Sequence, residues 1–166
     1  MPATPSFDAL VPFGWDDRVA TLFHTAAATT TATATATAST ADLSPARVVR
    51  VDRDRCLVVA DDGDTRAARA VDLPAAGDWV VLSPDRDEIV DVLPRRSALA
   101  RLDQVMAANL DVVLVLAALD RPLNLNRLER ELVLAWDSGA RPLVVLTKAD
   151  GATDDNADGA DRKSVV

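Results

Sequence analysis

The stretch DVVLVLAALDRPLNLNRLERELVLAWDSGARPLVVLTKAD, residues 111–150, decides how the C-terminal part of this chain folds. Residues 112–118 are continuously apolar, as expected of a strand that is covered on both faces in a parallel sheet. Apolar residues then recur at offsets of three and four over residues 125–135, which predicts an amphipathic helix. Residues 143–146 supply a second apolar strand. Strand, helix and strand in this order predict a βαβ unit with a right-handed crossover.

The predicted helix has boundary signals at both ends. Asn124 can cap its start, because an Asn side chain accepts a hydrogen bond from a backbone N–H of the first turn. Ser138 and Gly139 can end it, since glycine readily adopts the left-handed conformation that closes many helices.

The residues after the second strand, Thr147 to Asp150, lie where open α/β sheets bind ligands, just beyond the carboxyl end of a strand. Asp150 has two oxygens that can accept the ring N–H and the amino N–H of guanine together, a donor pair that adenine lacks. Lys148 can lay its methylenes along the base, and the chain's one other lysine is Lys163. We interpret Thr147, Lys148 and Asp150 as a guanine-binding loop. The alternative is that this short Lys-x-Asp pattern is solvated loop sequence.

Residues 44–100 have a different pattern, in which short β-like runs alternate with turn sequences. The runs are residues 46–51, 56–60, 65–70, 79–82 and 89–93. Turn chemistry such as Asp61-Asp62-Gly63 separates them and is typical of antiparallel strands. Five short strands predict an OB-like barrel, with a β-sandwich fragment as the alternative.

Three flanking segments are expected to lie outside these two domains. Helical spacing of apolar residues in the N-terminal segment, residues 1–24, predicts a short helix that Asp16 could start. Residues 25–43 are mostly Ala and Thr without periodicity, which predicts a low-complexity linker. Residues 153–166 lack apolar periodicity and end in a hexapeptide that resembles a translated sequencing adapter, so we expect a disordered or artefactual tail.

Charge and composition limit the function classes. A net charge of -8 argues against a simple cationic nucleic-acid binder, so any RNA contact must be local. The candidate RNA-binding residues are the arginines of the barrel region, which are Arg47, Arg50, Arg95, Arg96 and Arg101. The alternative is that they are ordinary solvated arginines.

The sequence contains no signal for a membrane, a disulfide, a metal or a catalytic group. No apolar run approaches the roughly 20 residues that span a bilayer, and the N-terminus does not resemble a secretory signal. The single cysteine, Cys56, cannot form an internal disulfide. His24 has no nearby Cys or His partner, and we find no acid–base pair or nucleophile arrangement. We expect a cytoplasmic protein that is a monomer.

Several motifs resemble the circularly permuted ribosome-biogenesis GTPases of the RsgA family. They are residues 14–16 (GWD), 77–80 (GDWV), 93–97 (LPRRS), 104–111 (QVMAANLD), 124–130 (NLNRLER), 138–142 (SGARP) and 146–150 (LTKAD). The resemblance runs from about residue 10 to residue 152, apart from the Ala/Thr segment. It implies an OB domain, then a GTPase domain whose guanine motif precedes its phosphate loop, then a zinc-binding domain.

The resemblance also implies what the protein binds. GTP or GDP would be the nucleotide, and the small ribosomal subunit with its rRNA would be the partner. Residues 101–152 would form part of the GTPase domain. No Gly-x-x-x-x-Gly-Lys-Ser/Thr run is present in the chain, so Mg²⁺ and zinc are expected only in a missing C-terminal part. We therefore expect an N-terminal fragment, inactive alone, of a GTP hydrolase that acts in late maturation of the small subunit.

One residue departs from the family pattern. The family motif usually begins with Asn, whose amide helps tie this loop to the phosphate loop, and here the position is Thr147. A function of another class also remains open, namely a non-enzymatic OB-fold module that binds RNA or another partner and carries the βαβ segment as an appendage.

Overall fold

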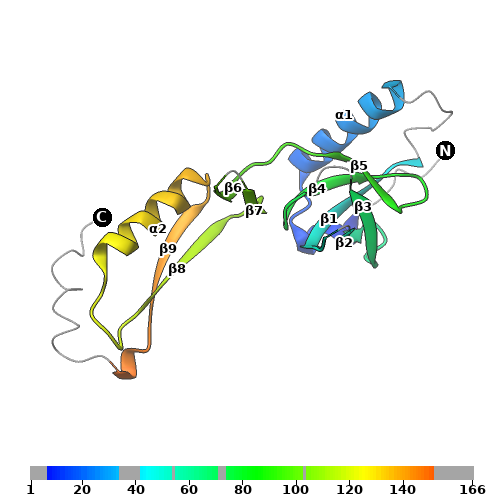
Figure 1. Ribbon diagram of the computed structural model, residues 1–166. Coiled ribbons are helices and arrows are strands. Elements are labelled where there is room, and N and C mark those ends of the chain that lie inside the picture. The colour runs from blue at the N-terminus through cyan, green and yellow to red at the C-terminus, as the bar shows by residue number, and fades with distance from the viewer. Residues whose placement is uncertain (1–6, 34–41, 54, 71–73, 103, 152–166) are drawn as a thin grey trace. The chain divides into compact units, whose positions relative to one another are not determined.

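The computed structural model in Figure 1 describes residues 7–33, 42–53, 55–70, 74–102 and 104–151. The chain divides into two compact units, which are residues 1–96 with 105–109 (unit 1) and residues 97–104 with 110–166 (unit 2). The tail predicted over residues 153–166 lies outside the described residues. Among the helices of the described segments, none has the length and apolar character needed to cross a membrane.

The N-terminal segment contains a 3-10 helix, η1 (Asp8–Phe13), and a longer helix, α1 (Asp17–Thr33). Asp16 caps α1 as predicted, because its Oδ1 accepts a hydrogen bond from the Val19 N–H at 2.8 Å. The helix is longer than predicted, so the expected linker over residues 25–43 is wrong for residues 25–33, and residues 34–41 of that linker lie outside the described residues.

The physical reason for the longer helix is local. Alanine has the highest helix propensity, which favours a helix over this alanine-rich segment. Threonine hydroxyls on successive turns donate to carbonyl oxygens four residues earlier, which satisfies the hydroxyls but slightly weakens the helix. These bonds run from Thr21 to Asp17 at 2.8 Å, from Thr25 to Thr21 at 2.9 Å and from Thr29 to Thr25 at 3.0 Å. Ala27 is fully buried, so the Ala/Thr sequence does contribute one face to the core.

Five strands form a closed barrel in unit 1, and the predicted OB-like barrel is confirmed over the sandwich alternative. The strands are β1 (Ser44–Val51), β2 (Arg55–Ala60), β3 (Thr65–Ala70), β4 (Trp79–Leu82) and β5 (Glu88–Val92). Their order is β1-β2-β3-β5-β4, and β1 closes the barrel by pairing antiparallel with β4. The β3–β5 pair alone is parallel, over residues 69–70 and 88–89, among the barrel pairings of the described residues.

Alternating side chains of the barrel strands fill two separate clusters. Val48, Val58, Val80 and Leu82 point into the barrel and are at most 1 % exposed. Residues of the opposite parity on β2 and β4, such as Val59 and Trp79, pack beneath η1 and α1. The N-terminal helices therefore cover one outer face of the barrel. The Trp15 ring contacts the rings of Phe7 and Trp79 in this outer cluster, whereas the barrel interior is aliphatic.

Gly77 marks the turn that leads into β4. Its φ is +89°, and a Cβ at this position would lie 2.2 Å from the carbonyl oxygen of Ala108. No side chain fits there without moving the backbone, which explains a glycine at the start of the GDWV motif.

Unit 2 contains the predicted strand–helix–strand segment. It consists of β8 (Val112–Ala118), α2 (Leu125–Asp137) and β9 (Arg141–Thr147), with β8 and β9 parallel. Asn124 caps α2 as predicted, accepting from the Arg127 N–H at 3.0 Å. Two further strands that the sequence did not predict are β6 (Ala98–Arg101), which lies in unit 2, and β7 (Gln104–Ala108), of which residues 105–108 belong to unit 1.

Candidate functional site

The carboxyl ends of β8 and β9 lie side by side in unit 2. The parallel register pairs Ala118 with Thr147 as its last partners, and the Leu119 N–H donates to the Thr147 carbonyl at 2.9 Å. The chain leaves both strands immediately afterwards, at Asp120 and Lys148. Two loops that are distant in sequence therefore start next to each other at one edge of the sheet.

The loop after β9 is a tight turn. Lys148 has a φ of +56°, which is uncommon for a residue other than glycine. A 3-10 turn, η3 (Ala149–Gly151), follows, and the Gly151 N–H donates to the Lys148 carbonyl at 3.1 Å. This geometry places Asp150 between the two hydrogen-bonded ends of the turn, where its side chain is exposed.

Lys148 forms an ion pair across the two loops. Its Nζ lies 2.5 Å from Oδ2 of Asp120, with the two side chains 61 % and 35 % exposed. The hydrogen bond from Lys148 lowers the pKa of the Asp120 carboxyl below its ordinary value, with a further Coulombic effect of Lys148 and a smaller one of Arg121. Asp120 was not a candidate from the sequence, because the parallel register alone brings it to Lys148.

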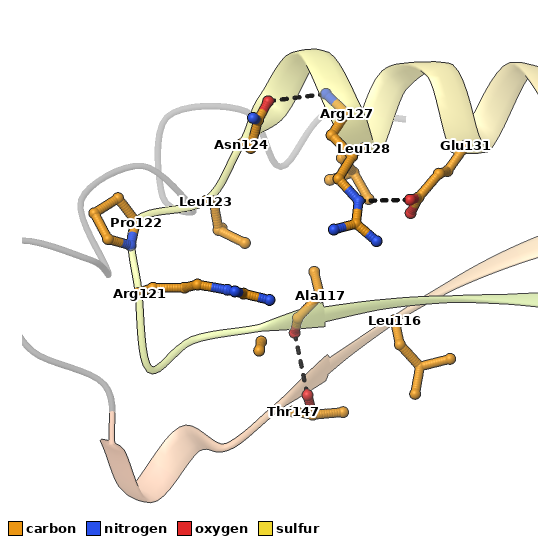
Figure 2. Close-up of a pocket in the computed structure, with 11 residues that line it drawn as sticks. Leu116, Ala117, Arg121, Pro122, Leu123, Asn124, Arg127, Leu128, Glu131 and Thr147 are labelled. Atoms are coloured by element: carbon orange, nitrogen blue, oxygen red, sulfur yellow. Dashed lines mark hydrogen bonds and ion pairs between the residues drawn. The ribbon is translucent and has the colours of Figure 1, made fainter.

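Thr147 uses its hydroxyl within the sheet. Its Oγ1 donates to the Ala117 carbonyl at 3.5 Å, which is a long hydrogen bond to the neighbouring strand (Figure 2). The structure thus brings Thr147, Lys148 and Asp150 together on one short segment. Lys148 is engaged by Asp120 and Thr147 by β8, while the Asp150 carboxylate faces solvent.

A pocket of about 390 Å³ lies beside this loop, between α2 and the carboxyl end of β8. Figure 2 shows the Arg121 side chain extending into the space between the helix and the strand. Arg127 and Glu131 of α2 form an ion pair on its helix side, at 2.7 Å. Of the three predicted guanine-binding residues, Thr147 therefore lines the pocket, whereas Lys148 and Asp150 do not.

The five candidate RNA-binding arginines differ in their partners and exposure, and Arg95 pairs with a buried carboxylate. Arg95 donates from Nε to Oδ1 of Asp78 at 2.8 Å and from Nη2 to Oδ2 at 2.6 Å, and Asp78 is fully buried. This bidentate bond, led by the hydrogen bond to Asp78, raises the pKa of Arg95. Arg95 therefore has a structural partner inside unit 1.

The remaining four candidates differ in their surroundings. Arg47 donates to the Phe13 carbonyl at 2.6 Å and stacks 4.9 Å from the Trp79 ring centroid. Arg50 pairs with Asp52 at the surface at 2.8 Å. Arg96 is exposed in unit 1, whereas Arg101 is exposed at the end of β6 in unit 2.

The barrel presents two arginines that the sequence did not single out. Arg55 of β2 lies directly opposite Arg69 of β3 in the antiparallel register, and both are exposed. Arg50 lies on the next strand, opposite Leu57. Like charges directly opposite each other destabilise a sheet. The Arg55–Arg69 pair is therefore unfavourable for folding, and both side chains lie on the exposed outer surface of the barrel. The alternation of side chains along each strand indicates that Arg55 and Arg69 face outward, but only the strand register shows that they lie opposite each other.

Metal-binding chemistry is not represented in the described segments, where no three His, Cys, Asp or Glu side chains gather closely enough to hold a metal ion. His24, on α1, stands next to the Phe23 ring at 5.5 Å between centroids. Cys56 is buried in the barrel, and burial is the main cause that raises the pKa of its thiol.

Comparison with known proteins links the chain to one family. The family model described as RsgA GTPase matches residues 92–165. A protein of Streptomyces coelicolor named small ribosomal subunit biogenesis GTPase RsgA is 42 % identical over 158 residues, covering 86 % of this chain and 40 % of that protein. A protein of the same name from Streptomyces avermitilis is 40 % identical, and the match covers 85 % of this chain and 39 % of that protein. Another, from Opitutus terrae, is 34 % identical, and the match covers 85 % of this chain and 43 % of that protein. The chain thus spans about 40 % of the length of these three relatives.

Proposed function

The chain belongs to the RsgA family, and from this premise we propose that it is the N-terminal portion of a GTPase that acts in late maturation of the small ribosomal subunit. In this proposal unit 2 supplies guanine recognition and unit 1 supplies an RNA-binding barrel. GTP hydrolysis belongs to the longer parent protein. This chain alone is inactive, because its sequence contains no run that could form the phosphate cradle.

The observation that supports guanine recognition is the position of the Thr147–Asp150 segment. It directly follows β9, and β9 is parallel to β8 with a helical crossover between them. Ligands of such sheets bind outside the carboxyl ends of the strands. A Lys-x-Asp pattern at this place is a stronger signal than the same residues on an arbitrary loop.

Asp150 is proposed to select the base. Its exposed carboxylate can accept from the guanine ring N–H and amino group in a bidentate, charge-assisted pair. Adenine leaves this acceptor pair unsatisfied, at a cost of about 1–3 kcal/mol, which corresponds to roughly tenfold to hundredfold selection. Lys148 packs its methylene stem along the base. Thr147, which bonds to β8 instead of offering an amide, makes a weaker tie to a phosphate loop than Asn would.

The test exchanges the donor–acceptor pattern at Asp150. In Asp150→Asn an amide offers one acceptor and one donor, which matches xanthine, where an oxygen replaces the guanine amino group. Applied to the parent protein, this variant should lose guanine nucleotide affinity by roughly tenfold to hundredfold and gain xanthine nucleotide affinity. Fluorescent-nucleotide titrations measure both. If the variant binds guanine and xanthine nucleotides as the wild type does, Asp150 does not recognise the base.

The fragment itself offers a second measurement. Calorimetry of this chain with GDP should give very weak binding or none, because most of the nucleotide's charge lies on phosphates for which the sequence supplies no loop. Micromolar affinity for GDP would contradict the proposal that this chain recognises the base but lacks the phosphate contacts.

The barrel is proposed to contact rRNA through arginines on its outer strands. Arg55 and Arg69 lie opposite each other on β2 and β3, and Arg50 lies on β1 opposite Leu57, two positions along β2 from Arg55. Barrels of this type commonly bind oligonucleotides. Arg47, Arg96 and Arg101 remain weaker candidates, and Arg95 is withdrawn because it bonds to buried Asp78. Each arginine that contacts a phosphate should contribute about 0.7 to the salt slope of single-stranded RNA binding.

Arg55→Gln and Arg69→Gln should therefore lower RNA affinity and make the dependence on salt less steep. Arg127→Gln is the matched control, because Arg127 pairs with Glu131 on α2 in the other unit. An equal loss in the control would mean that only net charge matters.

The wider assignments follow from the family. We propose GTP and GDP as ligands, the small ribosomal subunit and its rRNA as partner, and a cytoplasmic, monomeric protein. Mg²⁺ and zinc would bind in the remainder of the parent protein.

A further inference from the structure

Asp120 contacts the proposed guanine loop where its turn begins. Its Oδ2 accepts from the Lys148 ammonium at 2.5 Å. The Gly151 N–H donates to the Lys148 carbonyl and closes the turn. Asp120 also lies beside the end of the turn, because a Cβ added to Gly151 would come within 3.4 Å of the Asp120 Cβ. Asp150 lies inside the turn that begins at the residue Asp120 holds.

We propose that Asp120 is a positioning residue of the guanine loop, which fixes the Lys148 stem and the Asp150 carboxylate before the base arrives. This inference rests on the proposed function, since it assigns a role in base recognition. Asp120 itself does not touch the base. It acts through Lys148, the residue at which the turn that carries Asp150 begins.

The proposed role follows from the chemistry of lysine. The base packs against the methylene stem of Lys148, whereas the ammonium lies at the far end and can stay paired with Asp120. A lysine side chain loses much rotamer freedom when it is ordered. A partner that orders the stem in advance lowers the cost of binding, which is the general benefit of preorganisation.

The size of the effect is limited by exposure. Lys148 and Asp120 are 61 % and 35 % exposed, and surface ion pairs of this kind add little to folding. The gain should appear in ligand affinity instead of global stability. Removing the Asp120 charge should weaken guanine nucleotide binding about threefold to tenfold, and high salt should shrink this difference because it screens the pair.

The first experiment uses this chain and needs no nucleotide. Solvent exchange of the Gly151 amide, measured by NMR, should become faster in Asp120→Asn and stay near wild type in Asp120→Glu, which retains the carboxylate. Asp137→Asn is the matched control, because it removes the same charge at the other end of α2. If Asp120→Asn leaves the Gly151 exchange rate unchanged, Asp120 does not order the loop and the inference is overturned.

The second experiment uses the parent protein and compares guanine with adenine nucleotides. If the wild type does not prefer guanine, the proposed function fails, and the inference fails with it. If guanine is preferred, Asp120→Asn should weaken its binding about threefold to tenfold, Asp120→Glu should restore it to within about twofold, and Asp137→Asn should have no effect.

A double-mutant comparison of guanine nucleotide affinities distinguishes a positioning role of Asp120 from a purely structural one. In Lys148→Met, the additional change Asp120→Asn should cost nothing further, because the two side chains act as one unit. Additive losses, or tighter guanine binding in Asp120→Asn alone, would overturn the inference while leaving the proposed function intact. The latter result would mean that Asp120 competes with the base for Lys148.

Discussion

The barrel of unit 1 and the βαβ segment of unit 2 are both aliphatic, but they bury their side chains to very different degrees. In the barrel, Val48, Val80 and Leu82 are at most 1 % exposed. On β8 and β9, four leucines are between 47 % and 60 % exposed, and these are Leu114, Leu116, Leu143 and Leu146. The barrel closes on itself through β1 and β4, whereas β8 and β9 form a two-stranded sheet. Topology, and not composition, therefore decides how much of each unit is buried.

The difference in burial predicts that unit 1 is more stable to unfolding than unit 2. A closed barrel satisfies its strand edges and encloses a core without help from other elements. A two-stranded sheet with one helix provides little enclosed volume, and isolated two-stranded structures are marginally stable. We predict that the barrel unfolds as a stable unit and that β8, α2 and β9 open more readily.

The largest expected effect is the loss of a core side chain from the barrel. Leu82→Ala should destabilise unit 1 by about 2–5 kcal/mol, because it removes a fully buried leucine and leaves a cavity. Leu143→Ala on β9, where the leucine is 47 % exposed, is the matched control and should cost much less. Native-state hydrogen exchange measures both units in one experiment. Equal protection of barrel and β8–β9 amides in the wild type would contradict the comparison itself.

A somewhat smaller effect is expected at the buried carboxylate of unit 1. Asp78 accepts from the Ala75 N–H at 2.7 Å as well as from Arg95, and it is fully buried. Asp78→Ala should cost about 1.5–3 kcal/mol, because it leaves these donors without their acceptor. Asp52→Ala removes the surface partner of Arg50 and should change stability by less than about 1 kcal/mol. Urea unfolding should separate the two variants.

The sequence was sufficient for the elements that have a clear apolar pattern or a capping residue, although the burial of β8 on both faces that it predicted is wrong, because Leu114 and Leu116 are more than half exposed. The five barrel strands and the strand–helix–strand order followed from alternating runs, apolar runs and capping residues such as Asn124. The strands β6 and β7 were missed because they lack such a pattern, and Leu102 between them is 90 % exposed. The Ala/Thr part of α1 was missed because alanine's high helix propensity favours a helix without producing a hydrophobic period in the sequence.

The candidate site shows the same limit. The position of Lys148 and Asp150 beyond a strand could be predicted, because the motif and the strand are adjacent in the chain. The contact between Asp120 and Lys148 joins residues 28 apart and depends on the register of two parallel strands. The pairing of Arg55 with Arg69 depends likewise on register. Single-sequence patterns give the parity of a strand position, but they do not give its neighbour on the next strand.

A local effect is expected at the start of α2. Asn124→Ala removes the acceptor for the Arg127 N–H, which should destabilise the helix by about 1 kcal/mol. Asn126→Ala is the matched control, because Asn126 is the second residue of the same helix and is also exposed. This variant should be neutral or slightly stabilising. Exchange rates of α2 amides should rise in the first variant alone, while barrel amides should not respond to either. A change in barrel protection would mean that the two units unfold together.

The smallest expected effect is the response of the Lys148–Asp120 pair to acid. This pair is an exposed contact of unit 2, in contrast to the Asp78–Arg95 pair of unit 1, in which the carboxylate is fully buried. Hydrogen bonding to Lys148 lowers the pKa of Asp120 below its ordinary value of 3.8. A group with a depressed pKa in the folded state contributes above the pKa of the unfolded chain, and that contribution is lost as the pH falls through the folded pKa. The carboxyl carbon shift of Asp120 should therefore titrate below 3.8 in the wild type and closer to 3.8 in Lys148→Met. Arg121→Gln should move the titration less, because Arg121 contributes a smaller Coulombic effect and no hydrogen bond. A larger change in Arg121→Gln than in Lys148→Met would show that the ion pair does not hold Asp120 in solution.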